Sequence, residues 1–432
     1  MTLFFLILFV SIVFLLELYV FRILFSFCFR TEPRLERNIT NKIASYFDSG
    51  GKITFTIIYW TLIIALPINM FLHFQGIIEP YEFKPWIYVN AFFFIFAITR
   101  LSLAFYSGIA DIIGWLDNKI TKSSDLGDYD PGRKSFIQKM ALLVGILPFP
   151  TLTYGMIRNP YRYRVRENII GLKDLDERLE GLRIVQISDI HSGSWVFKSP
   201  VETAIKKINE LKPDLVFFTG DLVNYKASEM EPFVEFFSQI ESTYGVYSVL
   251  GNHDYGEYYR WDSKQDQKGN FQEMLNVHKR MGWKLLRNEN EIININGAEL
   301  AVIGVENYSA LPQFPNYGDL SLAYEGTKNA EVRILLSHDP THWDAEVRKY
   351  FEDIHITLSG HTHGFQFGFE IPGFVRWSPS SLVYNQWAGL YQSGSQYLYV
   401  NRGLGFLGYP GRVGILPEIT FIELRDKKED LV

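Results

Sequence analysis

The sequence has almost no cysteine: Cys28, inside an apolar run, is the only one among 432 residues. A disulfide framework and a thiolate metal site each need at least two cysteines, so both are excluded. Any metal ion must therefore bind to His, Asp, Glu or Asn side chains. The sequence also lacks an excess of positive charge, since its formal net charge is −6, and this argues against a nucleic-acid partner.

Long apolar runs are plentiful, and they are concentrated at the beginning of the chain. A membrane-spanning helix needs about 20 mostly apolar residues. We therefore predict an α-helical transmembrane region over residues 1–158, with about four helices at 3–21, 53–74, 86–106 and 140–157. The first run lacks the basic start and the small-residue cleavage site of a signal peptide, so we interpret it as a retained helix. Arg100 is expected to reach the interface or to pair inside the bundle.

The orientation of these helices follows from Lys and Arg in the short loops, which favour the cytoplasmic side. The loops after the first and third runs are basic, so the alternation places the amino terminus outside, together with everything after the fourth run. The segment "GRKSFIQK" before the fourth run resembles a twin-arginine export signal. Four arginines directly after that run favour the opposite face: Arg158, Arg162, Arg164 and Arg166. We expect an exported globular domain, with the cytoplasmic face as the alternative.

The rest of the chain has the rhythm of a globular domain, with a linker expected at 159–180 and the domain at 181–432. Short runs rich in branched residues, such as "LRIVQIS", "PDLVFFTG" and "GVYSVLG", predict buried strands. The segments "SPVETAIKKINELK" and "EPFVEFFSQIES" between them predict helices. Strand–helix–strand repetition indicates an α/β fold with a mainly parallel sheet.

Polar residues with metal-binding side chains follow five of the predicted strands. In open α/β sheets, ligands bind at the carboxyl ends of the strands, so we expect these residues to meet at one edge. Their side chains supply imidazole, carboxylate and amide donors, which suit Mn, Fe or Zn. One ion takes four to six ligands, so seven ligands with an open edge predict two ions sharing a bridging carboxylate. The seven candidates are Asp189, His191, Asp221, Asn252, His338, His361 and His363.

The ordered set "DIH…GDLVN…GNHD…SHDP…GHTHG" resembles the calcineurin-like metallophosphoesterases, and "GNHDYGEY" resembles their bacterial membrane-associated branch. The resemblance implies a four-layer β-sandwich flanked by helices, here preceded by the transmembrane region. It also implies that Asp221 bridges two metals. The implied ligands of the first metal are Asp189, His191 and His363, and those of the second are Asn252, His338 and His361. His253 would stabilise the scissile phosphate or protonate the leaving oxygen, and Asp254 would orient the His253 ring.

The function implied is a metal-dependent phosphoric ester hydrolase of the bacterial inner membrane, in which a metal-activated hydroxide attacks phosphorus. The aromatic segment after the histidine pair, 365–391, predicts a loop at the lipid interface or a packed cap. A lipid-linked phosphodiester or pyrophosphate is the expected substrate. Arg402 and Arg412 could hold a second phosphate. The alternatives are a phosphomonoesterase or phosphodiesterase for soluble substrates, and a non-catalytic membrane scaffold that retains the fold.

Overall fold

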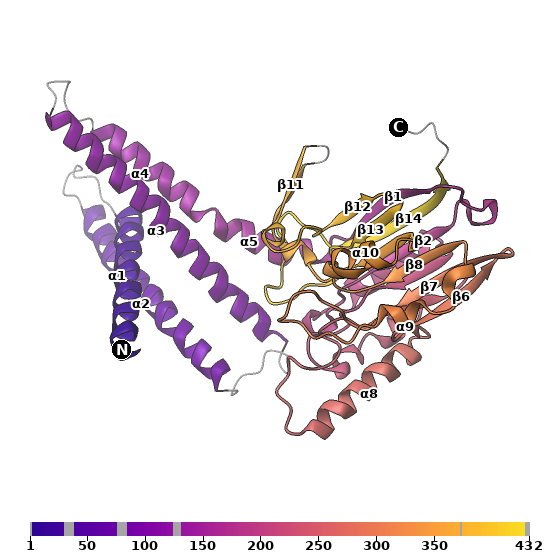
Figure 1. Ribbon diagram of the computed structural model, residues 1–432. Coiled ribbons are helices and arrows are strands. Elements are labelled where there is room, and N and C mark those ends of the chain that lie inside the picture. The colour runs from indigo at the N-terminus through magenta and orange to yellow at the C-terminus, as the bar shows by residue number, and fades with distance from the viewer. Residues whose placement is uncertain (1, 30–38, 76–83, 124–130, 372–373, 428–432) are drawn as a thin grey trace. The chain divides into compact units, whose positions relative to one another are not determined.

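The computed structural model describes residues 2–29, 39–75, 84–123, 131–371 and 374–427 (Figure 1). The chain divides into two compact units, Met1–Thr153 and Tyr154–Val432. Four helical segments are long and apolar enough to span a membrane, at Ser11–Phe29, Gly50–His73, Trp86–Lys119 and Gly132–Tyr161. The helices that contain them are α1 (Thr2–Phe29), α2 (Ile39–Phe74), α3 (Trp86–Ser123), α4 (Pro131–Ile146) and α5 (Pro148–Ile157).

These helices extend beyond the apolar runs predicted from the sequence, because polar flanking residues continue the same helices. The fourth predicted helix is divided at Leu147, between α4 and α5. Pro148 explains the division, since proline disfavours helical backbone at the preceding residue and cannot donate a backbone hydrogen bond.

One charged pair lies buried between the membrane helices. The Arg100 guanidinium on α3 lies 2.5 Å from the Glu17 carboxylate on α1, and both side chains are buried. The Tyr59 hydroxyl on α2 donates a second hydrogen bond to that carboxylate, at 2.8 Å. Pairing inside the bundle, one of the two outcomes expected for Arg100, is thus confirmed.

The second unit is built on two six-stranded sheets. The first contains, in spatial order, β1 (Arg164–Leu172), β14 (Glu418–Asp426), β2 (Arg183–Ile187), β3 (Leu215–Phe218), β4 (Val246–Ser248) and β5 (Lys284–Leu285). The second contains β12 (Gly389–Ser393), β13 (Gln396–Val400), β9 (Ile356–Ser359), β8 (Val332–Leu336), β7 (Ala298–Gly304) and β6 (Glu289–Ile295). A separate two-stranded ribbon pairs β10 (Phe369–Ile371) with β11 (Val375–Trp377).

Parallel pairing dominates the centre of each sheet, as predicted. Strands β2, β3, β4 and β5 are parallel, and so are β7, β8, β9 and β13. Antiparallel partners occur at β14–β2, β6–β7 and β12–β13, so both sheets are mixed.

Three buried clusters define four layers. Side chains from both sheets, such as Phe217 and Val302, form the apolar interior of the sandwich. The other face of the first sheet packs on α6 (Ser199–Glu210), α7 (Val234–Phe237) and α8 (Lys264–Arg280). The other face of the second sheet packs on α9 (Leu320–Tyr324) and a π-helical turn, Trp343–Val347, that leads into α10 (Arg348–Tyr350). Alternation of side chains across each strand supplies both faces with apolar residues.

Two local predictions were wrong. Residues 159–180 were expected to be a linker, but 164–172 form β1, which pairs in parallel with β14 along nine residues. Local sequence patterns could not predict this pairing, because the two strands lie far apart in the sequence. The helix expected over "EPFVEFFSQIES" is regular only over Val234–Phe237, because the flanking residues form tighter turns with i→i+3 hydrogen bonds, such as that from the Gln239 amide to the Phe236 carbonyl.

Candidate metal centre

Every candidate metal-binding residue follows the end of a strand, as the sequence predicts. Asp189 follows β2, Asp221 follows β3, Asn252 follows β4, His338 follows β8, and the histidine pair follows β9. The backbone holds these ends together: the Asp189 amide donates to the Gly220 carbonyl, and the Gly360 amide donates to the His338 carbonyl. The two sheets therefore bring the polar residues to one shared edge.

The backbone at this edge is strained. Five of the candidate residues have left-handed φ angles: Asp189 (51°), His191 (46°), Asp221 (62°), His361 (71°) and His363 (51°). Such a conformation costs a non-glycine residue of order 1–3 kcal/mol and concentrates at functional sites. Two neighbouring glycines serve close approach instead: a Cβ on Gly360 would lie 2.2 Å from Asp189 Oδ2, and one on Gly251 would lie 2.3 Å from Asp221 Oδ1. The local sequence thus allows short side chains to converge.

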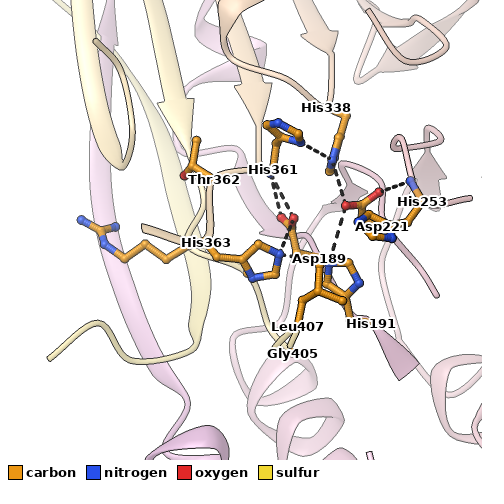
Figure 2. Close-up of polar contacts among 12 residues, drawn as sticks. Asp189, His191, Asp221, His253, His338, His361, Thr362, His363, Gly405 and Leu407 are labelled. Atoms are coloured by element: carbon orange, nitrogen blue, oxygen red, sulfur yellow. Dashed lines mark hydrogen bonds and ion pairs between the residues drawn. The ribbon is translucent and has the colours of Figure 1, made fainter. Parts of the chain in front are cut away.

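The first cluster contains Asp189, His191 and His363, all buried. The Nε2 atoms of the two histidines face each other at 3.0 Å, and His363 Nε2 lies 3.2 Å from Asp189 Oδ1. Figure 2 shows the three side chains pointing toward one another. Their potential ligand atoms lie within 4.8 Å of one another, which is a span that one ion can bridge.

The second cluster contains Asp221, His338 and His361. Asn252 joins it, since its Oδ1 lies 2.8 Å from His361 Nδ1, and His338 Nε2 lies 3.3 Å from the same nitrogen. Asp221 also lies beside the first cluster: its Oδ2 lies 3.2 Å from His338 Nε2 and 3.5 Å from His191 Nε2 (Figure 2).

Outer hydrogen bonds orient these candidate ligands. His338 Nδ1 donates to the Thr219 carbonyl at 2.7 Å, which directs its Nε2 toward the centre. The Asn252 amide nitrogen donates to the Tyr258 hydroxyl at 3.0 Å, which turns its oxygen inward. The hydroxyl of Tyr384 lies 2.9 Å from His361 Nε2. Neither tyrosine was assigned a role from the sequence, although Tyr258 ends the quoted "GNHDYGEY" segment and Tyr384 lies in the aromatic segment 365–391.

His253 lies beside both clusters without belonging to either. Its backbone amide donates to Asp221 Oδ1 at 2.9 Å, and its Nδ1 lies 2.7 Å from the Asn224 carbonyl. The expected role of Asp254 was wrong: its carboxylate accepts from the backbone amides of the turns, Gly251 and Asp221 at 2.9 Å and Leu222 at 2.8 Å. Asp254 therefore holds the loops together, and Asn224 orients the His253 ring. Asn224 ends the quoted "GDLVN" motif, which could have indicated it.

The electrostatics of the edge are those of a cation site. Burial opposes ionisation of Asp189, but His363 beside it keeps the pKa of that carboxyl well below its usual range. Burial likewise disfavours a charged His338, yet the Asp221 carboxylate raises the pKa of His338 to about 10. Burial keeps the pKa of His191 well below normal. The ionised, buried carboxylate of Asp189 thus favours a positive charge at this edge, and the low pKa of His191 keeps that imidazole neutral. This donor set fits two divalent cations.

The two arginines expected to hold a second phosphate do not face this centre. Arg412 is fully buried and donates to the carbonyls of Arg402, Gly403 and Gly405. Arg402 pairs with Glu418 at 2.6 Å and with Glu370 at 2.5 Å. Both guanidinium groups are consumed by structural contacts, so neither is offered to a substrate.

A cavity of about 230 Å³ lies against Tyr384, the residue that contacts His361. Its lining combines the polar side chains of Thr341, Asp344, Asn385 and Gln386 with the apolar side chains of Pro340 and Val383. The cavity is therefore suited to a substrate group that has both polar and apolar parts.

Comparison with known families agrees with the motif order and the geometry. A family model described as "Calcineurin-like phosphoesterase" matches residues 182–365. The chain belongs to the calcineurin-like metallophosphoesterases. A second model, "Probable Calcineurin-like phosphoesterase, transmembrane domain", matches residues 1–160. The chain is thus a membrane-anchored member of a family of metal-dependent phosphoric ester hydrolases.

Relatives of this metallophosphoesterase occur in bacteria and animals. "Uncharacterized metallophosphoesterase YkuE" of Bacillus subtilis is 29% identical over 68% of this chain and 97% of its own length. An "Uncharacterized metallophosphoesterase" of Helicobacter pylori is 26% identical over 97% of this chain and 99% of its own length. "Transmembrane protein with metallophosphoesterase domain" of Danio rerio is 31% identical over 66% of this chain, which matches only 63% of that protein.

Proposed function

We propose that this metallophosphoesterase uses two divalent cations to hydrolyse a phosphodiester or pyrophosphate of a lipid-linked substrate. Asp189, His191 and His363 would hold one ion, and Asp221 would be shared between the two. Asn252, His338 and His361 would complete the second site. The proposal rests above all on Asp221 Oδ2, which lies within 3.5 Å of a histidine nitrogen from each cluster. The nitrogen and oxygen donors suit Mn, Fe or Zn.

A bound pair of this kind supplies Lewis-acid stabilisation of a phosphoryl group and a nucleophile active at neutral pH. The residues of the chain do the rest. His253 Nδ1 is engaged by the Asn224 carbonyl, so its Nε2 is the nitrogen available to protonate the leaving oxygen. Tyr258 packs against the His253 ring, with 4.5 Å between ring centroids, and restricts its motion.

The lipid-linked part of the proposal is supported by the membrane anchor. Four candidate spans keep the enzyme at a bilayer, where lipid phosphates are the concentrated phosphoric esters. We also propose that the catalytic unit is exported. The alternation of basic and non-basic loops supports export, whereas the arginines that follow the fourth span, among them Arg166, support the cytoplasmic alternative.

The test uses the purified full chain in lipid nanodiscs, loaded separately with Mn²⁺, Fe²⁺ or Zn²⁺. Hydrolysis of bis(p-nitrophenyl) phosphate measures the chemistry, and a total bacterial lipid extract followed by mass spectrometry measures lipid cleavage. Lipids that accumulate in a deletion strain identify the substrate, and a periplasmic reporter fused at the carboxyl terminus reports the membrane face.

The outcomes separate the parts of the proposal. Two bound ions with no hydrolysis of any phosphoric ester would refute the catalytic function. Cleavage of the soluble ester without cleavage or accumulation of any lipid would leave a phosphodiesterase for soluble substrates. A reporter active only in the cytoplasm would refute export.

A further inference from the structure

The ribbon formed by β10 and β11 has one polar and one apolar face. Phe369 pairs with Trp377 and Ile371 pairs with Val375, whereas Glu370 pairs with Arg376. Side chains alternate between the two faces of a strand. The four apolar residues therefore share one face, and the two charged residues share the other.

The polar face is the one anchored to the domain. Glu370 accepts from Arg402 at 2.5 Å and pairs with Arg166. On the other strand, Arg376 donates to the Ala388 carbonyl at 2.6 Å, and its guanidinium lies 4.8 Å from the centre of the Tyr391 ring. The ribbon is thus held in a defined orientation by its charged side chains.

The apolar face is turned outward. Phe367, Phe369, Ile371, Val375 and Trp377 are all exposed, and Phe374 at the turn is 84% exposed. Figure 1 shows the β11 end of the ribbon projecting from the sheets of its unit. A ribbon in water presents the opposite pattern, with apolar residues inward and charges outward. Exposed apolar patches of this kind mark interaction surfaces.

The base of the ribbon is joined to the C-terminal part of the fourth candidate span, Gly132–Tyr161. The Arg412 amide donates to the Gly155 carbonyl at 3.0 Å, and the Asn159 side chain donates to the Arg412 carbonyl at 2.8 Å. The next residue, Val413, exchanges hydrogen bonds with Gln366 and Gly368 at the start of the ribbon. Residues 412 and 413 therefore connect the ribbon to the end of this candidate span, which would lie at a membrane surface.

We propose that the outward face of the β10–β11 ribbon inserts into the lipid interface and docks the catalytic unit against the bilayer. Aromatic side chains favour this depth of the membrane, and burial of the exposed face removes its contact with water. Docking depends only on the exposed apolar face of the ribbon, and it does not require that the unit hydrolyses a phosphoric ester. It would present the metal centre to phosphates of the membrane surface, because the ribbon begins six residues after His363.

The single cysteine makes a depth measurement direct. In a Cys28→Ser background, Phe374→Cys and Ile371→Cys are labelled with an environment-sensitive fluorophore, and the full chain is reconstituted in nanodiscs at one copy per disc. Lys206→Cys on α6 is the matched control, since its side chain is 78% exposed and lies on a charged helix. We expect doxyl-labelled lipids to quench both ribbon labels at least twofold more than the control label.

A kinetic experiment tests whether docking affects hydrolysis of a substrate in the bilayer. Ile371→Asp with Phe374→Asp should raise KM for a bilayer-embedded substrate at least fivefold and leave hydrolysis of bis(p-nitrophenyl) phosphate unchanged. Equal, weak quenching of the ribbon and control labels would overturn the proposal. The proposal would also be overturned if the ribbon labels were shielded only in nanodiscs that hold two copies of the chain, because a second chain would then cover this face.

Discussion

Replacement of His253 by alanine should lower turnover strongly and leave both metal ions in place. The side chain takes part in neither ligand cluster, and its hydrogen bond is made to the Asn224 carbonyl at 2.7 Å. The contact of residue 253 with Asp221, the carboxylate proposed to be shared, is made by its backbone amide at 2.9 Å, which alanine retains. The substitution thus removes the imidazole without removing support for the ligands.

The expected loss of turnover follows from the proposed role of His253 as a general acid. General acid catalysis contributes roughly 10²–10⁴-fold, or about 3–5 kcal/mol of barrier. A nitrophenolate leaves readily without a proton, whereas an alkoxide does not. We therefore expect a loss near the lower end with bis(p-nitrophenyl) phosphate and near the upper end with an alkyl phosphodiester.

The assay pairs kcat on both esters with metal content by mass spectrometry of the purified protein. Asn252→Ala is the contrasting variant, because its Oδ1 faces His361 Nδ1 at 2.8 Å and its removal should lose one ion. If His253→Ala lost metal, or if both esters slowed equally, leaving-group protonation by His253 would be refuted.

Three further predictions concern metal binding and stability. Asp221→Ala should reduce metal content from two ions to almost none, and retention of one ion would show that the carboxylate is not shared. Burial lowers the pKa of His278 to about 3, so the unfolded chain binds more protons between about pH 3 and 6.5 and stability falls as the pH drops. Going from pH 7 to 5 should cost about 2 kcal/mol through this group, and His278→Gln should melt with a smaller pH dependence. Arg100→Leu should destabilise the membrane bundle by about 3–5 kcal/mol, because Glu17 is left buried and unpaired. The control is Arg133→Leu, which removes an exposed ion pair. If the melting temperature of Arg100→Leu in detergent changed as little as that of the control, the prediction would be contradicted.

The candidate metal centre was largely predictable because its information is local. Each candidate ligand follows a short run of branched residues, and a parallel sheet brings such positions to one edge. The partners around the ligands were not predictable in this way. Asn224, Tyr258 and Tyr384 reach the centre by loop conformations that no periodicity encodes.

The sequence by itself determined the apolar helices, several of the buried strands, and the set of candidate donor atoms, because hydrophobic periodicity and residue chemistry are properties of short segments. Only the tertiary structure decided that β1 joins the first sheet, that Arg402 and Arg412 serve the fold, that Asp254 braces the turns, and that the ribbon turns its apolar face outward. Each of these depends on contacts between residues far apart in the chain, and such contacts leave no local pattern.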